Sequence, residues 1–182
     1  NRVVVTIEKM RSLLRNVQTE HQRLDLRAVA QSAVLYARTS TAAARLGIDS
    51  TGLDQDPATP AWIEGDAAQI QIAIVNLLRN AAEAVAGSTT SAPWIGISLR
   101  REQEHWRLQV AVNGPGFQGD AAEMHPLHTT KSNGSGLGLF VVRTTMENHH
   151  GTLECDVSQR GGAQLRLRFP ALPHSDLPTT GD

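Results

Sequence analysis

Three side chains that carry oxygen donors share one face of a predicted helix. Asn76, Asn80 and Glu83 stand at i, i+4 and i+7, within about 60° of one another around the helix axis. An apolar stripe that includes Ile74 and Leu77 runs beside them. Amide and carboxylate oxygens suit a Mg²⁺ ion that bridges phosphates. The pattern indicates a pocket for a metal-bound phosphate, and taken alone it also fits a solvated helix face.

A glycine-rich segment, residues 134–139, comes directly before another predicted helix. Its glycines leave backbone N–H groups able to face an anion, and the helix dipole favours phosphate at that end. Two hydroxyls and a lysine precede it. The spacing does not fit the G-x-x-x-x-G-K-[ST] phosphate loop, which argues against that class of enzyme. The candidate phosphate-binding residues are Thr129, Thr130, Lys131, Gly134, Gly136, Leu137 and Gly138.

A short turn at residues 113–116 directly follows a predicted strand. Gly114 and Gly116 allow the backbone to turn sharply and allow a flat ring to approach it closely. Taken alone, this segment is also compatible with a simple turn.

Alternating helices and strands must position these residues. Apolar spacing predicts helices over residues 2–20, 26–37, 66–87 and 139–150, with Asp66 as the N-cap of the third. Period-two alternation predicts hairpins from residues 95–99 with 106–112 and from 153–157 with 165–169. Residues 47–61 are expected to form a short strand and a loop, and residues 113–136 a long loop. Helices gathered against one mixed sheet indicate an α+β fold, a two-layer sandwich.

The composition excludes several classes of function. The net charge is −1, with no basic excess of the kind that nucleic-acid or membrane surfaces require. The single cysteine, Cys155, lacks a partner for an internal disulfide, so a cytoplasmic setting is expected. No run of about 18 or more apolar residues is present. Because the chain begins at Asn1 rather than at a methionine, we expect it to be a fragment of a longer protein, in which a membrane anchor can precede it.

Four motifs together resemble those of sensor histidine kinases. Residues 76–84 (NLLRNAAEA) resemble the N box, residues 113–116 (NGPG) the end of the G1 box, residues 129–131 (TTK) the end of the F box, and residues 134–139 (GSGLGL) the G2 box. They occur in the family's order over roughly residues 24–170. The form of the N box is most similar to the nitrogen- and oxygen-sensing branch.

The resemblance implies the Bergerat ATP-binding fold and a role for each matching residue. Asn80 would hold Mg²⁺ and Lys131 would reach the terminal phosphates, so these two are the expected catalytic residues. Asn76 and Glu83 would lie near the phosphates. Gly114 and Gly116 would shape the adenine end, where Val112 also lies. Gly134, Gly136, Leu137 and Gly138 would form the phosphate-facing lid, after Thr129 and Thr130.

The resemblance also implies a domain organisation and partners. Residues 1–22 would be the C-terminal part of a dimerisation and phosphoacceptor hairpin, residues 23–170 the catalytic domain and residues 171–182 a disordered tail. The domain would transfer the γ-phosphoryl group of ATP to a histidine on its own hairpin domain in a homodimer. The group would then pass to a response regulator receiver domain.

The chain departs from the family pattern in two places. The G1 box normally has an Asp that accepts a hydrogen bond from the adenine amino group, and Val112 stands there, with Asn113 as a conceivable substitute acceptor. No H box is present, so no autophosphorylation of the chain alone is expected. We interpret His21 as a surface residue. The remaining histidines are expected in the lid or on the surface: His125, His128, His149 and His150.

Two alternative functions follow from these departures. Val112 favours a pseudokinase that acts as a scaffold with impaired nucleotide binding. An ATPase of the gyrase or heat-shock type is less well supported, because Asn76 stands where those enzymes have a water-activating Glu.

Overall fold

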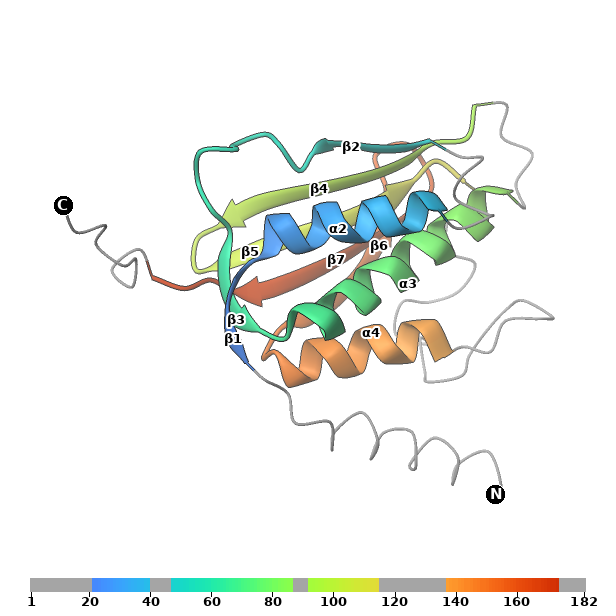
Figure 1. Ribbon diagram of the computed structural model, residues 1–182. Helices are drawn as coiled ribbons and strands as arrows, with labels where there is room; N and C mark the ends of the chain where they lie inside the picture. The colour runs from blue at the N-terminus through green and yellow to red at the C-terminus, as the bar shows by residue number, and fades with distance from the viewer. Residues whose placement is uncertain (1–20, 40–46, 87–91, 115–136, 174–182) are drawn as a thin grey trace, which may run out of the picture.

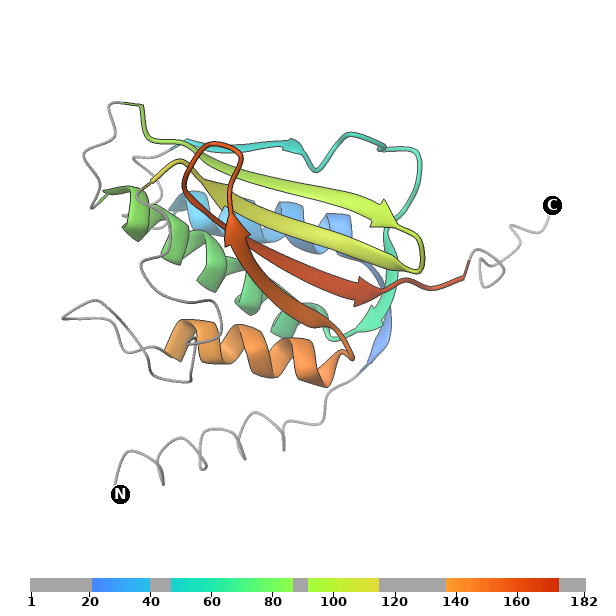
Figure 2. The same cartoon turned by 180° about the vertical axis from the view of Figure 1, so that it is seen from behind.

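The computed structural model describes residues 21–39, 47–86, 92–114 and 137–173. Within them, three helices cover one face of a five-stranded mixed sheet (Figure 1), and no described helix covers the opposite face (Figure 2). The predicted two-layer α+β sandwich is therefore confirmed. The predicted helix over residues 2–20 and most of the predicted tail lie outside the described residues.

The sheet has the strand order β2-β4-β5-β7-β6. Both predicted hairpins are present: β4 pairs with β5 and β6 with β7, each antiparallel, and β5 pairs antiparallel with β7. Strand β2 pairs with β4 in parallel and makes the sheet mixed. The strands are β2 (Ile48–Gly52), β4 (Ile95–Glu102), β5 (His105–Val112), β6 (Thr152–Val157) and β7 (Ala163–Pro170).

The helix layer consists of α2 (Leu26–Thr39), α3 (Ala67–Ala86) and α4 (Leu137–Asn148). Helix α3 lies between the other two and packs against both (Figure 1). Its apolar stripe is buried, with Ile74 and Leu77 fully inaccessible to solvent. Because α2 and α4 contact α3 on its two sides and the sheet contacts its buried face, the remaining polar face of α3 has a fixed position.

A small second sheet was not predicted. Strand β1 (Gln22–Asp25) pairs antiparallel with β3 (Trp62–Gly65). Each strand has four residues, which is too short to show a clear alternation in sequence. The pairing places the start of α2 beside the residue that precedes β3, where the N–H of Leu26 donates to the carbonyl oxygen of Ala61 at 2.9 Å.

His149 is buried, so its interpretation as a surface residue was wrong. Its side chain is 3% exposed. Its Nε2 accepts a hydrogen bond from the backbone N–H of Asp66 at 2.9 Å, and its Nδ1 lies 2.6 Å from the carbonyl oxygen of Thr145. The ring also stacks on His21, which is itself exposed, with centroids 4.9 Å apart. His149 therefore joins the end of α4 to the start of α3.

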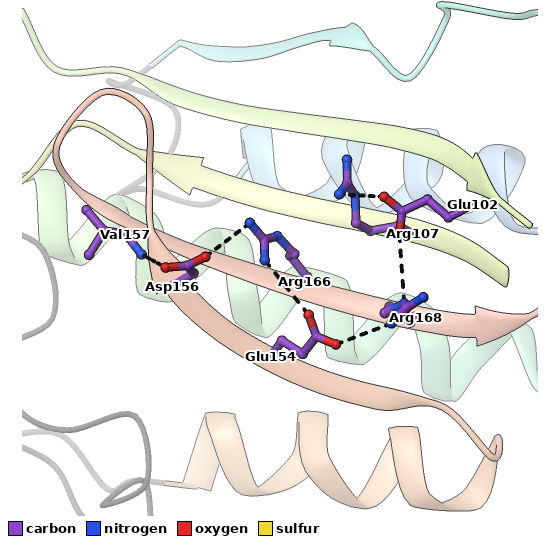
Figure 3. Close-up of polar contacts among 7 residues, drawn as sticks. All are labelled: Glu102, Arg107, Glu154, Asp156, Val157, Arg166 and Arg168. Carbon is purple, nitrogen blue, oxygen red and sulfur yellow. Dashed lines mark hydrogen bonds and ion pairs between the residues drawn. The ribbon is translucent and has the colours of Figure 1, made fainter.

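The outer face of the sheet carries a network of ion pairs. The side chains alternate with buried residues that face the helices, and their N–O distances lie between 2.6 and 3.8 Å (Figure 3). All are partly exposed, so each pair contributes little stability. The network runs through Arg107, Glu102, Arg168, Glu154, Arg166 and Asp156.

The chain after β7 remains attached to the body for two residues. The N–H of Ala171 donates to the carbonyl oxygen of Glu104 at 2.9 Å, and the N–H of Leu172 donates to that of Trp62 at 3.0 Å. None of the helices in the described residues is both long and apolar enough to span a membrane.

Candidate functional site

Helix α3 begins at the predicted N-cap. The carboxylate Oδ1 of Asp66 accepts hydrogen bonds from the backbone N–H groups of Ala68 at 2.9 Å and Gln69 at 3.1 Å. These bonds satisfy donors that a helix start would otherwise leave unpaired. Together with the contact from His149, the cap fixes the direction of α3 and of its polar stripe.

The polar stripe of α3 faces away from the sheet. Asn76 is half-buried; its Nδ2 donates to the carbonyl oxygen of Ile72 at 3.0 Å, and its Oδ1 accepts from Nη2 of Arg79 at 3.0 Å. Glu83 is exposed and lies 3.9 Å from Nε of Arg79. Asn80 is half-buried, and its side-chain amide has no hydrogen-bond partner among the described residues. An amide placed in this way is able to bind a ligand without breaking an existing bond.

The start of α4 meets this stripe. Gly138 is the second residue of α4, and a Cβ placed there would lie 3.4 Å from Oδ1 of Asn76. The same position is 3.5 Å from Nη2 of Arg79 and 3.5 Å from Nδ2 of Asn80. The structure therefore brings together two of the predicted motifs, which are more than fifty residues apart in sequence.

A phosphate-binding environment results from this contact. The first N–H groups of a helix are unpaired within it, and its dipole places about half a positive charge at that end. Asn76 and Asn80 add polar groups on the facing helix. The rest of the predicted phosphate-binding set lies outside the described residues: Gly116, Thr129, Thr130, Lys131, Gly134 and Gly136.

The end of β5 forms the other end of the site. A Cβ at Gly114 would lie 3.7 Å from the carbonyl oxygen of Ala84 and 3.8 Å from Cγ2 of Val85. The strand end is thus in contact with α3 one turn beyond Asn80. A Cβ at Gly162 would overlap the carbonyl oxygen of Val112, so the turn between β6 and β7 closes over this end from the other side.

Val112 belongs to the core. It is 3% exposed and pairs with Ile95 in the hairpin of β4 and β5. It therefore continues the buried face of β5. Its side chain has no polar atom with which to recognise a base.

Asn113 already has other partners. Its Oδ1 accepts from the backbone N–H of Trp94 at 2.8 Å, and its Nδ2 donates to the carbonyl oxygen of Ala92 at 2.7 Å. Its own N–H donates to the carbonyl oxygen of Trp94 at 3.3 Å. The side chain therefore joins the residues before β4 to the end of β5. With these bonds made, it is poorly placed to replace the carboxylate that would accept a hydrogen bond from the base.

Arg79 is the residue of this site to which the sequence interpretation gave no role. It lies inside the motif at residues 76–84, but it interrupts the polar spacing of Asn76, Asn80 and Glu83. The sequence feature that could have indicated a role for Arg79 is a cation directly beside the predicted metal-ligand stripe.

The family comparison covers most of the described chain. Residues 65–173 match the family described as histidine kinase-, DNA gyrase B-, and HSP90-like ATPase. The match includes α3, the end of β5 and α4, which carry the site.

Curated relatives are sensor kinases. Sporulation kinase B of Bacillus subtilis (strain 168) is 30% identical over 146 residues, which cover 79% of this chain and 33% of that protein. Sensory histidine kinase/phosphatase NtrB of Rhizobium leguminosarum bv. phaseoli is 36% identical over 136 residues, which cover 67% of this chain and 35% of that protein. The chain thus spans about a third of the length of these relatives.

A solved structure has the same fold. The mycobacterial sensor histidine kinase MprB superposes with a TM-score of 0.68 at 24% identity, covering 84% of this chain and 99% of that chain. At this identity the likeness supports the fold alone.

Proposed function

The chain belongs to the histidine kinase-, DNA gyrase B- and HSP90-like ATPase family, as the ATP-binding domain of a sensor histidine kinase, and we propose that it transfers the γ-phosphoryl group of ATP to a histidine outside these 182 residues. The observation that carries the proposal is the contact of Gly138 with Asn76 and Asn80, since it unites a metal-ligand stripe with a phosphate-binding helix start. ATP would lie with its phosphates at this contact and its base toward Gly114.

The residues present fit a magnesium ion. Asn80 carries an amide oxygen, a hard ligand, and its amide group lies at the helix start that would receive the phosphates, with Nδ2 toward Gly138. When bound, the ion would neutralise charge that develops on the phosphoryl group during transfer. The backbone N–H groups at the start of α4 would orient the phosphates, and Lys131 would add a positive charge.

The partners follow from this function. We assign the acceptor histidine to a dimerisation domain of the same protein, to which residues 1–22 would belong, and the second acceptor to a response regulator receiver domain. Because ATP and such regulators are found in the cytoplasm, the domain would work there. The scaffold alternative has only Val112 in its favour, and neither the family match nor the relatives support it.

Phosphate transfer to the acceptor domain tests the proposal. The chain is incubated with γ-labelled ATP and Mg²⁺, with and without a longer chain of the same protein that carries the acceptor histidine. We expect acid-labile label on the acceptor domain only, and none on the 182-residue chain alone. Label that appears stoichiometrically on His21, or no label in either mixture, would contradict the proposal.

A further inference from the structure

The guanidinium of Arg79 lies at the point where α3 meets the start of α4. Its Nη2 is 3.0 Å from Oδ1 of Asn76 and 3.5 Å from the position that a Cβ at Gly138 would occupy. The side chain is about half exposed, at 52%. It therefore extends from α3 toward the start of α4.

The existing contacts of Arg79 do not account for this placement. Its ion pair with Glu83 is long, at 3.9 Å, and both side chains are about half exposed. Exposed pairs of this kind contribute little, and an order with the cation N-terminal to the acid is the less favourable one on a helix. Its bond to Asn76 is to a neutral acceptor.

The positive charge of Arg79 and the N-terminus of α4 together favour binding of an anion. The guanidinium stands beside the N-terminus of α4, where the helix dipole contributes about half a further positive charge. A cation beside a helix N-terminus is unfavourable, and an anion bound to both removes that repulsion, which the distant Glu83 carboxylate does only in part. A guanidinium presents several N–H donors in one plane, which suits two oxygens of one phosphate.

We propose that Arg79 binds the terminal phosphates of the nucleotide, together with the N–H groups at the start of α4. This assignment rests on the proposed function and adds a phosphate-binding residue on α3. In the absence of nucleotide the guanidinium bonds to Asn76, and phosphate oxygens would replace this neutral acceptor. The released amide of Asn76 would then be available to the ligand beside Asn80.

Nucleotide binding by Arg79 variants tests the assignment. The 182-residue chain and its Arg79→Gln and Arg79→Lys variants are titrated with ATP, with AMP, and with tripolyphosphate as a phosphate-only probe. Calorimetry serves for ATP and ligand-observed NMR for the weaker ligands. Arg143→Gln is the matched control, because Arg143 is an exposed arginine on α4 and lies outside the site.

Loss of one charge-assisted phosphate contact predicts about tenfold weaker binding of ATP and tripolyphosphate by Arg79→Gln. AMP binding should stay unchanged, Arg79→Lys should recover part of the loss as a point charge, and Arg143→Gln should bind like the unsubstituted chain. The melting temperature of Arg79→Gln should stay close to that of the unsubstituted chain, because the side chain is exposed.

Three results would overturn the assignment. Equal loss for ATP, AMP and tripolyphosphate would show that Arg79 only supports the fold of the site through Asn76. Unchanged binding of ATP by Arg79→Gln would show that it does not contact phosphate. No binding of any ligand by the unsubstituted chain would overturn the proposed function itself, and this assignment with it.

Discussion

Gly138 of α4 lies directly against Asn80 of α3, so close that a Cβ on Gly138 would stand 3.5 Å from the amide nitrogen of Asn80. This distance is ordinary van der Waals contact, so the empty domain has room for a methyl group. The same methyl group would occupy the space in which we place the phosphates and the magnesium ion.

We therefore expect Gly138→Ala to separate folding from binding. The free energy of unfolding should be unchanged or raised by about 0.4–1 kcal/mol, because alanine favours the helix. ATP affinity should fall by about tenfold or more, since the methyl group displaces a hydrogen-bonded ligand. Thermal unfolding and calorimetric titration measure the two effects.

Gly47→Ala is the control for this substitution. A Cβ at Gly47 has no atom within 4 Å, so the substitution should leave ATP affinity unchanged, whatever small gain in stability alanine brings through the unfolded chain. Normal ATP binding by Gly138→Ala would place the phosphates elsewhere.

The stability of the domain should fall as the solution is acidified, because of His149. Burial lowers the pKa of His149 below 6.5, against the opposing effect of the Thr145 carbonyl, and His21 and His150 lower it further while Asp66 raises it. The neutral ring is required, because Nε2 accepts a hydrogen bond from Asp66. As pH falls below about 6.5, the unfolded chain binds a proton that the folded chain does not.

The free energy of unfolding should therefore fall by about 1.4 kcal/mol per pH unit until the pH reaches the pKa of His149 in the folded chain. Urea unfolding at about pH 7.5 and about pH 5.5 measures it. His149→Gln should be less stable at the higher pH but should lose less on acidification. Parallel losses in the two proteins would show that another group is responsible.

Val112→Asp should make nucleotide binding tighter and more selective for adenine. A carboxylate acceptor for the base amino group contributes about 1.5–3 kcal/mol, so ATP affinity should rise roughly tenfold or more, and GTP should gain less. The new carboxylate is buried in the empty domain, which should lower its free energy of unfolding by roughly 2–5 kcal/mol. Calorimetric titration of both forms with ATP and GTP tests this. Tight, adenine-selective binding by the Val112 form would show that another residue reads the base.

The parts of the fold that the sequence predicts are those with a long periodic signal. Helix α3 shows its apolar stripe over twenty residues and its N-cap at Asp66, so both its start and its buried face could be predicted. Strands β1 and β3 could not, because four residues give no clear period and their stability comes from pairing across the fold. His149 was misinterpreted for the same reason: its partner Asp66 is 83 residues away.

The site was predicted through the resemblance rather than through the residues alone. The motifs around Asn80 and Gly138 are each ambiguous, and only their order and spacing indicated that they would meet. Two contacts depend on side-chain conformation. They are the hydrogen bonds of the Asn113 side chain to Trp94 and Ala92, and the position of the Arg79 guanidinium beside the start of α4. No spacing rule encodes either contact.

Asn80 and the start of α4 together should bind a magnesium nucleotide. Calorimetric titration of a non-hydrolysable ATP analogue tests it, with and without Mg²⁺, on the unsubstituted chain and on Asn80→Ala. Because the Asn80 amide has no partner among the described residues, its loss should leave the melting temperature nearly unchanged. We expect one binding site that magnesium strengthens in the unsubstituted chain, with affinity about tenfold or more weaker and no magnesium effect in Asn80→Ala. Equal binding by both proteins, or no binding by the unsubstituted chain at about millimolar analogue, would show that Asn80 and the start of α4 do not form a magnesium-nucleotide site.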